Sequence, residues 1–285
     1  MGLTIAEAYP LWQDTDVVIG IGTRLEVPRW RWSNRPSGQK TVRIDIDPAE
    51  MRRSSPDVGI VADAREATLA MLVALEREKS AGRDRLPAIR SAREATAQQI
   101  RDIQPQVSYL EALRRALPAE AIVTDELSQV GFASWYAFPV YQPRTFISSG
   151  FQGNLGSGFP TALGAKVAFP SRPVVAICGD GGFMFGVQEL ATAAQYGINV
   201  IILLFNNNAY ANVLRDQMTG FGGRITGAIL KNPDFIQLAR AFDIPAERVT
   251  EPEQLSRVLQ LAIGSNRPWL IEIKVETNAE ASAFR

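Results

Sequence analysis

Short runs of apolar, β-forming residues alternate along this 285-residue chain with segments whose apolar residues recur at helical spacing. The runs PVVAIC, NVIILLF and PWLIEIKV are too short for buried helices, and glycine, proline or asparagine lies close to each of them. Continuous apolar runs of this length are typical of strands buried on both faces, which belong to parallel sheets joined by helices. The alternation therefore predicts an α/β fold with parallel sheets that helices cover on both faces.

A polar, charged stretch divides this alternation into two segments. In the first, DTDVVIGIGT and KTVRIDID are expected to be buried parallel strands, and VGIVAD a third, shorter one. We predict a first domain at residues 1–80, a partly helical connector at 81–105, and a second domain at 106–285. Doubly wound domains usually have about five or six strands. The first segment is therefore expected to be the second half of a domain.

Composition excludes several classes of protein. Lys+Arg and Asp+Glu are both 30, so the chain has no basic excess for nucleic acid. The single cysteine, Cys178, excludes an internal disulfide framework, and no apolar run reaches the ~18 residues that span a bilayer. The absence of histidine excludes Ser-His-Asp and Cys-His catalysis within this chain and histidine-bound zinc. We expect a cytoplasmic protein with no nucleic-acid or membrane partner.

Compact oxygen donors follow two successive predicted strands. Asp180 follows PVVAIC within a run of three glycines, and Asn207 follows NVIILLF within a run of three asparagines. Ligands of parallel α/β sheets bind beyond the carboxyl ends of the strands, where glycines let backbone N–H groups approach a phosphate. An aspartate there would repel phosphate unless a cation intervened, and Mg²⁺ accepts carboxylate, amide and phosphate oxygens together. The pattern predicts that Asp180 and Asn207 flank Mg²⁺ on a diphosphate, with the carbonyl of Ala209 as a third ligand.

Other interpretations of this pattern remain open. A lone GDG is most often a strand-to-helix turn, and lone asparagines usually cap or turn. A nicotinamide-dependent dehydrogenase would share the α/β pattern. Its G-x-G-x-x-G fingerprint is absent, since Phe183 and Met184 occupy the last two positions.

The spacing of the two motifs resembles the thiamine-diphosphate-binding motif, GDG followed by about two dozen residues and then NN. Here residues 182–205, 24 in number, separate GDG from Asn206 and Asn207. The stretch GNLGSGFPTALGAKVAFPSRPVVAICGDGGF resembles the pyrophosphate domain of acetolactate synthase-like enzymes, and DVVIGIGTRL and VRIDIDPAEM resemble the latter half of their central domain. The resemblance covers nearly the whole chain.

The resemblance implies roles for individual residues. Leu155 would be the wedge between the two cofactor rings, although it could be an ordinary core leucine. The Gly153 carbonyl and the Leu155 N–H would meet the pyrimidine ring, and Gln129 would contact the diphosphate. Tyr210 and Val213 would line the pocket or simply pack. The complete implied set for thiamine diphosphate is Gly153, Leu155, Gly179, Asp180, Gly181, Gly182, Gln129, Asn207 and Tyr210, with Asp180, Asn207 and Ala209 as the Mg²⁺ ligands.

The resemblance also implies the chemistry of a lyase or carboligase acting on 2-oxo acids. The family activates its cofactor with a glutamate of an N-terminal pyrimidine-binding domain, and no glutamate here matches it; Glu189 follows GDG and is expected to be structural. We therefore expect no catalytic residue within this chain, little turnover by the chain alone, and a partner pyrimidine domain. A truncated enzyme, one subunit of a split enzyme and a non-catalytic binding protein remain open, and homo-oligomers are expected.

Some positions depart from the acetolactate synthase pattern. Asn212 and Asp216 stand where those enzymes commonly carry a methionine and a tryptophan, which weakens the assignment of the substrate. The central domain binds FAD in some relatives and ADP in others, but only half of it is expected here. Arg24 and Asp47 could therefore be structural or could contact a nucleotide. Asp125 and Glu126, at a strand end, are expected to be solvated or capping.

Overall fold

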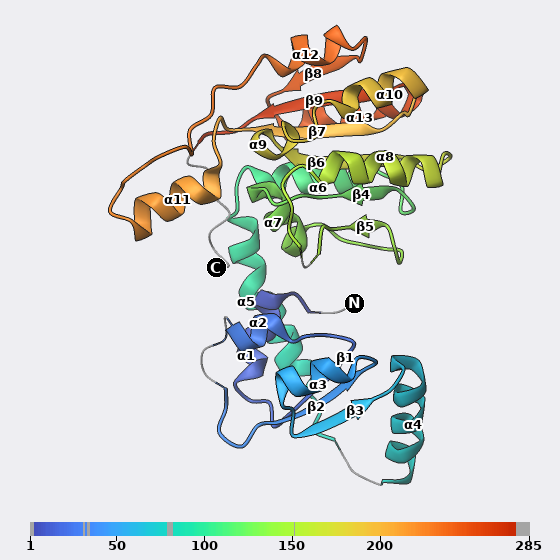
Figure 1. Cartoon of the computed structure of the whole chain (residues 1–285), viewed down its shortest axis with the longest axis vertical. Helices are drawn as coiled ribbons and strands as arrows, with labels where there is room; N and C mark the ends of the chain where they lie inside the picture. The colour runs from blue at the N-terminus through green and yellow to red at the C-terminus, as the bar shows by residue number, and fades with distance from the viewer. Residues whose placement is uncertain (1–2, 31, 33–34, 79–81, 151, 278–285) are drawn as a thin grey trace. The chain divides into compact units, whose positions relative to one another are not determined.

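A computed structural model of the chain describes residues 3–30, 32, 35–78, 82–150 and 152–277. It divides into two units, Met1–Gln98 and Gln99–Arg285, drawn in Figure 1. Both contain parallel strands alternating with helices, which confirms the predicted α/β class. The boundary predicted between residues 80 and 81 lies outside the described residues, and much of the predicted connector is one helix, α5 (Leu86–Arg101). No helix in the described ranges is long and apolar enough to cross a membrane.

The first unit contains a three-stranded parallel sheet in the order β1-β2-β3. Polar side chains begin its helices: Thr4, Asp47 and Asp63 each accept a hydrogen bond from a backbone N–H of the first turn. The elements are α1 (Ile5–Trp12), β1 (Val17–Ile21), α2 (Glu26–Trp30), β2 (Lys40–Asp45), α3 (Pro48–Ser54), β3 (Val58–Val61) and α4 (Ala64–Arg77).

The expectation that the first strand is buried is wrong. Val17, Ile19 and Ile21 of β1 are 46%, 48% and 41% exposed, whereas Gly20 between them is buried. Side chains alternate between the faces of a strand, so these three lie on the same face. This face of β1 is therefore largely open, and an apolar run alone does not reveal whether both faces of a strand are covered.

The second unit is built on a six-stranded parallel sheet in the order β5-β4-β6-β7-β9-β8. Its strands are β4 (Ile122–Thr124), β5 (Phe146–Ile147), β6 (Val174–Gly179), β7 (Ile201–Asn206), β8 (Ala246–Val249) and β9 (Trp269–Lys274). Its helices are α6 (Gln106–Ala116), α7 (Gln129–Ala137), α8 (Gly158–Ala168), α9 (Asp180–Phe183), α10 (Glu189–Tyr196), α11 (Ala211–Gly220), α12 (Phe235–Ala241) and α13 (Pro252–Ser265).

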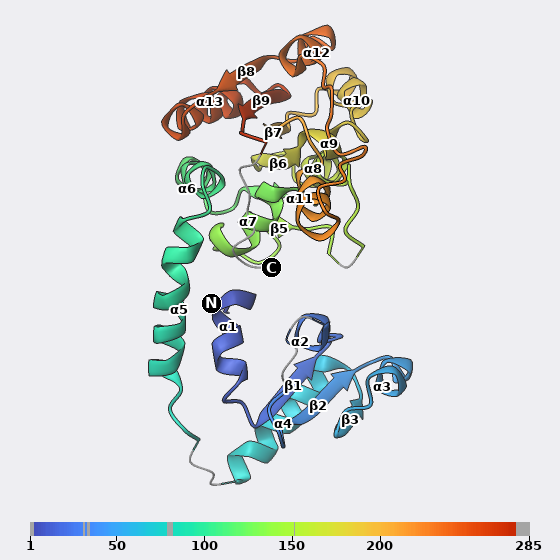
Figure 2. The same ribbon diagram turned by 90° about the vertical axis from the view of Figure 1, so that its left-hand side faces the viewer.

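Helices cover both faces of this sheet, as the apolar runs predict. Figure 2 shows α6 and α13 on one side of the strands and α8, α9 and α10 on the other. Val175 and Ile177 of β6 point into the core beneath α6, α7 and α13, and the alternate residues Val174, Ala176 and Cys178 point into the core beneath α8, α10 and α12. Burial of both sets explains why β6 has no polar side chain before its final glycine.

Three elements are not predicted by the sequence pattern: α7, α11 and the edge strand β8. β8 has the sequence AERV, whose two charged residues and partial burial hide the strand pattern. It pairs in parallel with β9. Because all six strands are parallel, the loops after β4, β6 and β7 leave the sheet at the same edge, which is where the candidate site lies.

Candidate functional site

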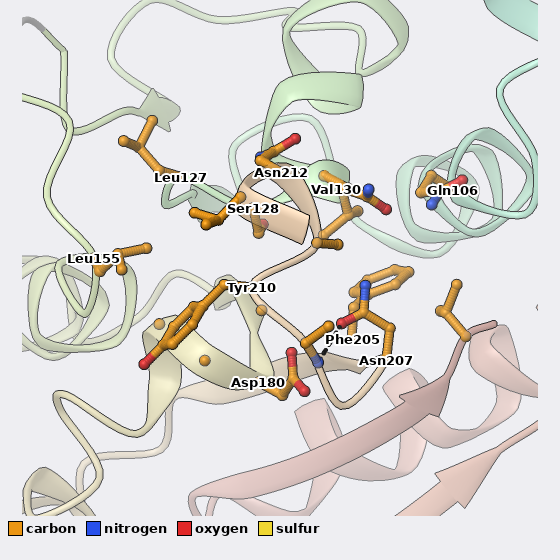
Figure 3. A pocket seen from close by; sticks show the side chains of 18 residues that line it. Gln106, Leu127, Ser128, Val130, Leu155, Asp180, Phe205, Asn207, Tyr210 and Asn212 are labelled. Atoms are coloured by element: carbon orange, nitrogen blue, oxygen red, sulfur yellow. Dashed lines mark hydrogen bonds between the residues drawn. The ribbon is translucent and has the colours of Figure 1, made fainter. Parts of the chain in front are cut away.

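A pocket at the carboxyl ends of β6 and β7 gathers the residues predicted for cofactor binding (Figure 3). Most of its lining comes from the segment after β4, from Leu155, from the turn between β6 and α9, from the loop after β7 and from the start of α11. Gly153 is the one predicted site residue outside this lining. The others all line the pocket: Gln129, Leu155, Gly179, Asp180, Gly181, Gly182, Asn207, Ala209 and Tyr210.

Asp180 lies directly after β6 and is only 2% exposed. Its Oδ2 accepts a hydrogen bond of 2.6 Å from Nδ2 of Asn232, a residue in the loop before α12. Burial raises the pKa of the Asp180 carboxyl above its ordinary value, and hydrogen bonds from Asn232 and from backbone N–H groups oppose that rise. A cation beside the carboxylate would favour its charged form.

The three consecutive asparagines have three different environments. Asn206 ends β7 and is buried, and its Nδ2 donates to Oε1 of Glu272 at 2.7 Å. Asn207 lines the pocket, where its Oδ1 accepts the backbone N–H of Ala209 at 3.2 Å. Asn208 adopts a left-handed backbone conformation with φ 55°, which asparagine tolerates better than most residues. The three asparagines therefore have three roles: Asn206 is held in the core, Asn207 lines the pocket and Asn208 forms a turn.

The glycines of the motif are required by close packing. A Cβ on Gly181 would lie 2.4 Å from the Tyr210 ring, and a Cβ on Gly182 would lie 2.3 Å from Oε1 of Glu126. A Cβ on Gly179 would lie 2.8 Å from Cβ of Ser128. Real Cβ atoms do not approach other atoms this closely, so the turn from β6 into α9 fits between its neighbours only with glycine at these three positions.

The expectation that the two acids after β4 are solvated is wrong, because both are almost fully buried, and neither side chain caps α7, the helix that follows them. Asp125 is 2% exposed and accepts a hydrogen bond from Nε1 of Trp135, whereas Ser128 caps α7. Glu126 is 1% exposed, and its two carboxylate oxygens accept the backbone N–H groups of Gly179 at 2.8 Å and of Gly156 at 3.0 Å. Burial raises the Glu126 pKa to about 7. Glu126 therefore ties together the two glycine-containing loops that border the pocket.

Leu155 is not an ordinary core leucine. Its side chain is 40% exposed and lines the pocket, three residues before α8 begins. Figure 3 shows Leu155 and Tyr210 on the same side of the pocket. Gly153 has a left-handed conformation, with φ 58°, and a Cβ there would lie 2.9 Å from Cδ1 of Leu127. The turn at Gly153 brings Leu155 to the pocket.

The donors at this site suit Mg²⁺ better than a transition metal. Among the residues that the structure describes, no three His, Cys, Asp or Glu side chains are grouped so that they could hold a metal ion. The pocket offers the carboxylate of Asp180, the amide of Asn207 and the backbone carbonyl of Ala209, which are the hard oxygen ligands that Mg²⁺ prefers. The side-chain amide of Gln129 also lines the pocket, and its buried Oε1 has no hydrogen-bond partner among the described residues. The residues fit a metal-bound diphosphate.

No sequence motif points to Asn232 or to the buried role of Glu126. Asn232 is 52 residues from Asp180 in sequence, and no local motif links the two. The position of Glu126, an acid close after a buried strand, gave only a weak indication of a functional or structural role. Val213 and Asn212 also line the pocket, in keeping with their position at the start of α11.

Comparison with known proteins agrees with this geometry. Residues 127–273 match the profile described as thiamine pyrophosphate enzyme, C-terminal TPP binding domain, and residues 1–72 match the central domain of the same enzymes. A probable 2-ketoarginine decarboxylase of Pseudomonas aeruginosa is 32% identical over 280 residues, covering 95% of this chain and 49% of that protein.

Two relatives bear the name of another enzyme. A probable acetolactate synthase large subunit of Methanocaldococcus jannaschii is 34% identical over 284 residues, covering 92% of this chain and 47% of that protein. The acetolactate synthase isozyme 3 large subunit of Escherichia coli is 30% identical over 287 residues, covering 95% of this chain and 50% of that protein. The chain spans about half the length of the curated relatives it matches. The C-terminal match alone covers more than half of the chain, and with the geometry of the pocket it shows that the chain belongs to the thiamine pyrophosphate enzyme family.

Proposed function

We propose that the chain binds thiamine diphosphate through Mg²⁺ in the pocket at the ends of β6 and β7, and serves in the conversion of 2-oxo acids. The observation that carries the proposal is the meeting of Asp180, Asn207 and Ala209 in one pocket beside the glycine loop after β6. Thiamine diphosphate, when bound, supplies the carbanion chemistry of such reactions. The names of the relatives, a decarboxylase and acetolactate synthases, support 2-oxo acids as the substrate class.

The residues of the pocket would divide the work of binding. Asp180, Asn207 and the carbonyl of Ala209 would hold Mg²⁺, and Gly181 and Gly182, which have no side chains, would let the diphosphate approach the backbone. The Gln129 amide would turn its N–H₂ group toward the diphosphate. Leu155, exposed within the pocket, would support the rings from one side.

The acid that activates the cofactor is proposed to come from outside this chain. No glutamate belongs to the pocket lining among the described residues, and Glu189 lies on α10, where its carboxylate accepts a hydrogen bond from Thr192. We therefore propose a pyrimidine-binding domain as the partner, with copies of the chain in an oligomer. The purified chain alone is expected to bind the cofactor without consuming a 2-oxo acid such as pyruvate.

The choice between decarboxylation and carboligation would depend on residues around α11. Asn212 lines the pocket where acetolactate synthases commonly carry a methionine, whereas Asp216 is exposed and pairs with Arg215 at 2.7 Å. FAD is not part of the proposal. In the first unit, Asp47 caps α3 and Arg24 pairs with Glu50 at 3.5 Å, so both candidate nucleotide contacts have structural partners.

Calorimetric titration of thiamine diphosphate into the chain, with excess Mg²⁺ or with EDTA, tests this proposal. We expect binding only with Mg²⁺, and its loss in Asp180→Ala. Asp180→Asn keeps the size of the side chain but removes its charge, and should retain the fold while losing most of the affinity. Metal-independent binding, or binding that survives Asp180→Ala, would contradict the proposed site.

A further inference from the structure

A chain of polar contacts crosses the carboxyl end of the sheet from the surface to Asp180. It begins at Arg248 of β8, whose Nε and Nη2 lie 2.8 and 2.7 Å from Oε2 of Glu272 on β9. The other oxygen of Glu272, Oε1, accepts Nδ2 of Asn206 at 2.7 Å. Oδ1 of Asn206 accepts Nδ2 of Asn232 at 3.0 Å, and the same nitrogen donates to Asp180 at 2.6 Å.

The buried part of this polar network costs folding free energy. Glu272 is 1% exposed in a strand whose neighbouring side chains Ile271 and Ile273 are fully buried and apolar. A buried carboxylate loses its hydration, and apolar residues of similar volume often stabilise such a position equally well or better. Both oxygens of Glu272 are nevertheless satisfied, one by Arg248 and one by Asn206. Such a network is better explained by the orientation it imposes than by stability.

The contacts fix the orientation of each amide in turn. Because the N–H₂ group of Asn206 faces Glu272, its oxygen must face Asn232 and the backbone N–H of Asn208. The N–H₂ group of Asn232 is then directed toward Asp180 and occupies its Oδ2. Because each carboxylate oxygen can accept more than one contact, Asp180 held in this orientation can still bind a further ligand.

The backbone that carries Asn232 is held against the loop of the asparagines. Leu230 donates its N–H to the carbonyl of Asn208 at 2.8 Å, and Tyr210 donates to the carbonyl of Ala228 at 2.8 Å. These bonds form an antiparallel bridge between Ala209 and Ile229. Asn232 is therefore placed relative to both the asparagine loop and Asp180.

We propose that Arg248, Glu272, Asn206 and Asn232 are positioning residues that hold the Asp180 carboxylate in the orientation that receives Mg²⁺. The inference rests on the proposed function. Hydrogen bonds to ligating carboxylates commonly tune metal sites, and loss of such a partner typically costs about 10- to 100-fold in metal affinity. The network would provide this support from residues that do not line the pocket.

The test is the Mg²⁺ concentration that gives half-maximal binding of thiamine diphosphate, measured by calorimetry on the full chain. Asn232→Leu removes the amide from a half-buried loop position and should raise this concentration about 10- to 100-fold. Its matched control is Asn199→Leu: Asn199 is equally half-buried and also donates Nδ2 to an asparagine, Asn266, but it precedes β7 at the opposite end of the sheet.

A second pair of variants tests the outer end of the network. Arg248→Met should raise the Mg²⁺ requirement by a smaller factor than Asn232→Leu, and Arg248→Lys should restore part of it. The control, Arg257→Met, breaks the exposed ion pair of Arg257 with Glu247 and should leave the requirement unchanged. The unfolding midpoint without cofactor is measured for all variants, because a purely structural role would change the midpoint and not the Mg²⁺ requirement.

The outcomes separate the two proposals. If the wild-type chain binds with Mg²⁺ and Asn232→Leu binds at the same Mg²⁺ concentration, the network proposal is overturned and the proposed function stands. Equal losses in Asn232→Leu and Asn199→Leu, in step with their unfolding midpoints, would also overturn it. A wild-type chain with no Mg²⁺-dependent affinity would overturn both.

Discussion

Glu126 should make the free energy of unfolding fall as the pH rises through the slightly acidic range. Burial raises its pKa from the ordinary 4.5 to about 7 in the folded chain, against hydrogen bonds from Gly179 and Gly156 that favour the charged form. Between these values the folded state keeps a proton that the unfolded chain has lost, so stability decreases with increasing pH. At about 1.36 kcal/mol for each pKa unit, the loss between pH 4.5 and 7 is roughly 3 kcal/mol.

The assay compares the wild-type chain with Glu126→Gln, which cannot titrate. Urea unfolding is followed by tryptophan fluorescence across this pH range, in EDTA so that no metal contributes. The wild-type stability relative to the variant should be greatest near pH 4.5 and lower by roughly 3 kcal/mol above pH 7. Glu120→Gln, an exposed change just before β4, should follow the wild-type profile. Parallel profiles for wild type and Glu126→Gln would refute the reasoning.

Three further changes have specific expected results. Gly182→Ala should lower the unfolding midpoint and abolish thiamine diphosphate binding, because its Cβ would lie 2.3 Å from Oε1 of Glu126. The control Gly164→Ala, in α8 with open space around it, should be neutral or stabilise the chain by up to about 1 kcal/mol. Equal unfolding midpoints for the two variants would contradict this. Leu155→Ala should weaken cofactor binding in calorimetry about tenfold, the loss of about 1.4 kcal/mol of apolar contact, with little effect on stability because the side chain is 40% exposed. Cys178 should resist thiol reagents at about pH 8 until denaturant unfolds the sheet, because burial raises the pKa of its thiol well above the ordinary value; rapid labelling of the folded chain would contradict this.

The sequence predicted the parts of the fold that depend on local pattern. Continuous apolar runs such as that of β6 identify strands buried on both faces, and the parallel sheet follows from their alternation with helices. The same rule failed for β1, whose run is equally apolar but whose Val17, Ile19 and Ile21 are exposed. A run of β-branched residues shows that a strand forms, but coverage depends on elements far away in sequence.

The candidate site was predictable where its residues follow strand ends. Asp180 and Asn207 could be paired because adjacent parallel strands deliver their loops to one edge of the sheet, and both residues line the same pocket. Asn232 and Glu272 could not be found in this way. Asn232 contacts Asp180, 52 residues away in sequence, and Glu272 contacts Asn206, 66 residues away. Neither residue lies in a motif that predicts its contact.

The charges around the pocket favour a strict requirement for the cation. Among the described residues that line it, none is a lysine or an arginine, and Asp180 is the one acid. The nearby buried acids are already satisfied: Glu126 by two backbone N–H groups and Glu272 by Arg248 and Asn206. A diphosphate entering this pocket would meet a carboxylate without any cationic side chain to offset the repulsion. A divalent ion held by Asp180 and Asn207 would reverse the sign of the local field, so we expect the metal to be a condition for binding the proposed cofactor rather than an aid to it.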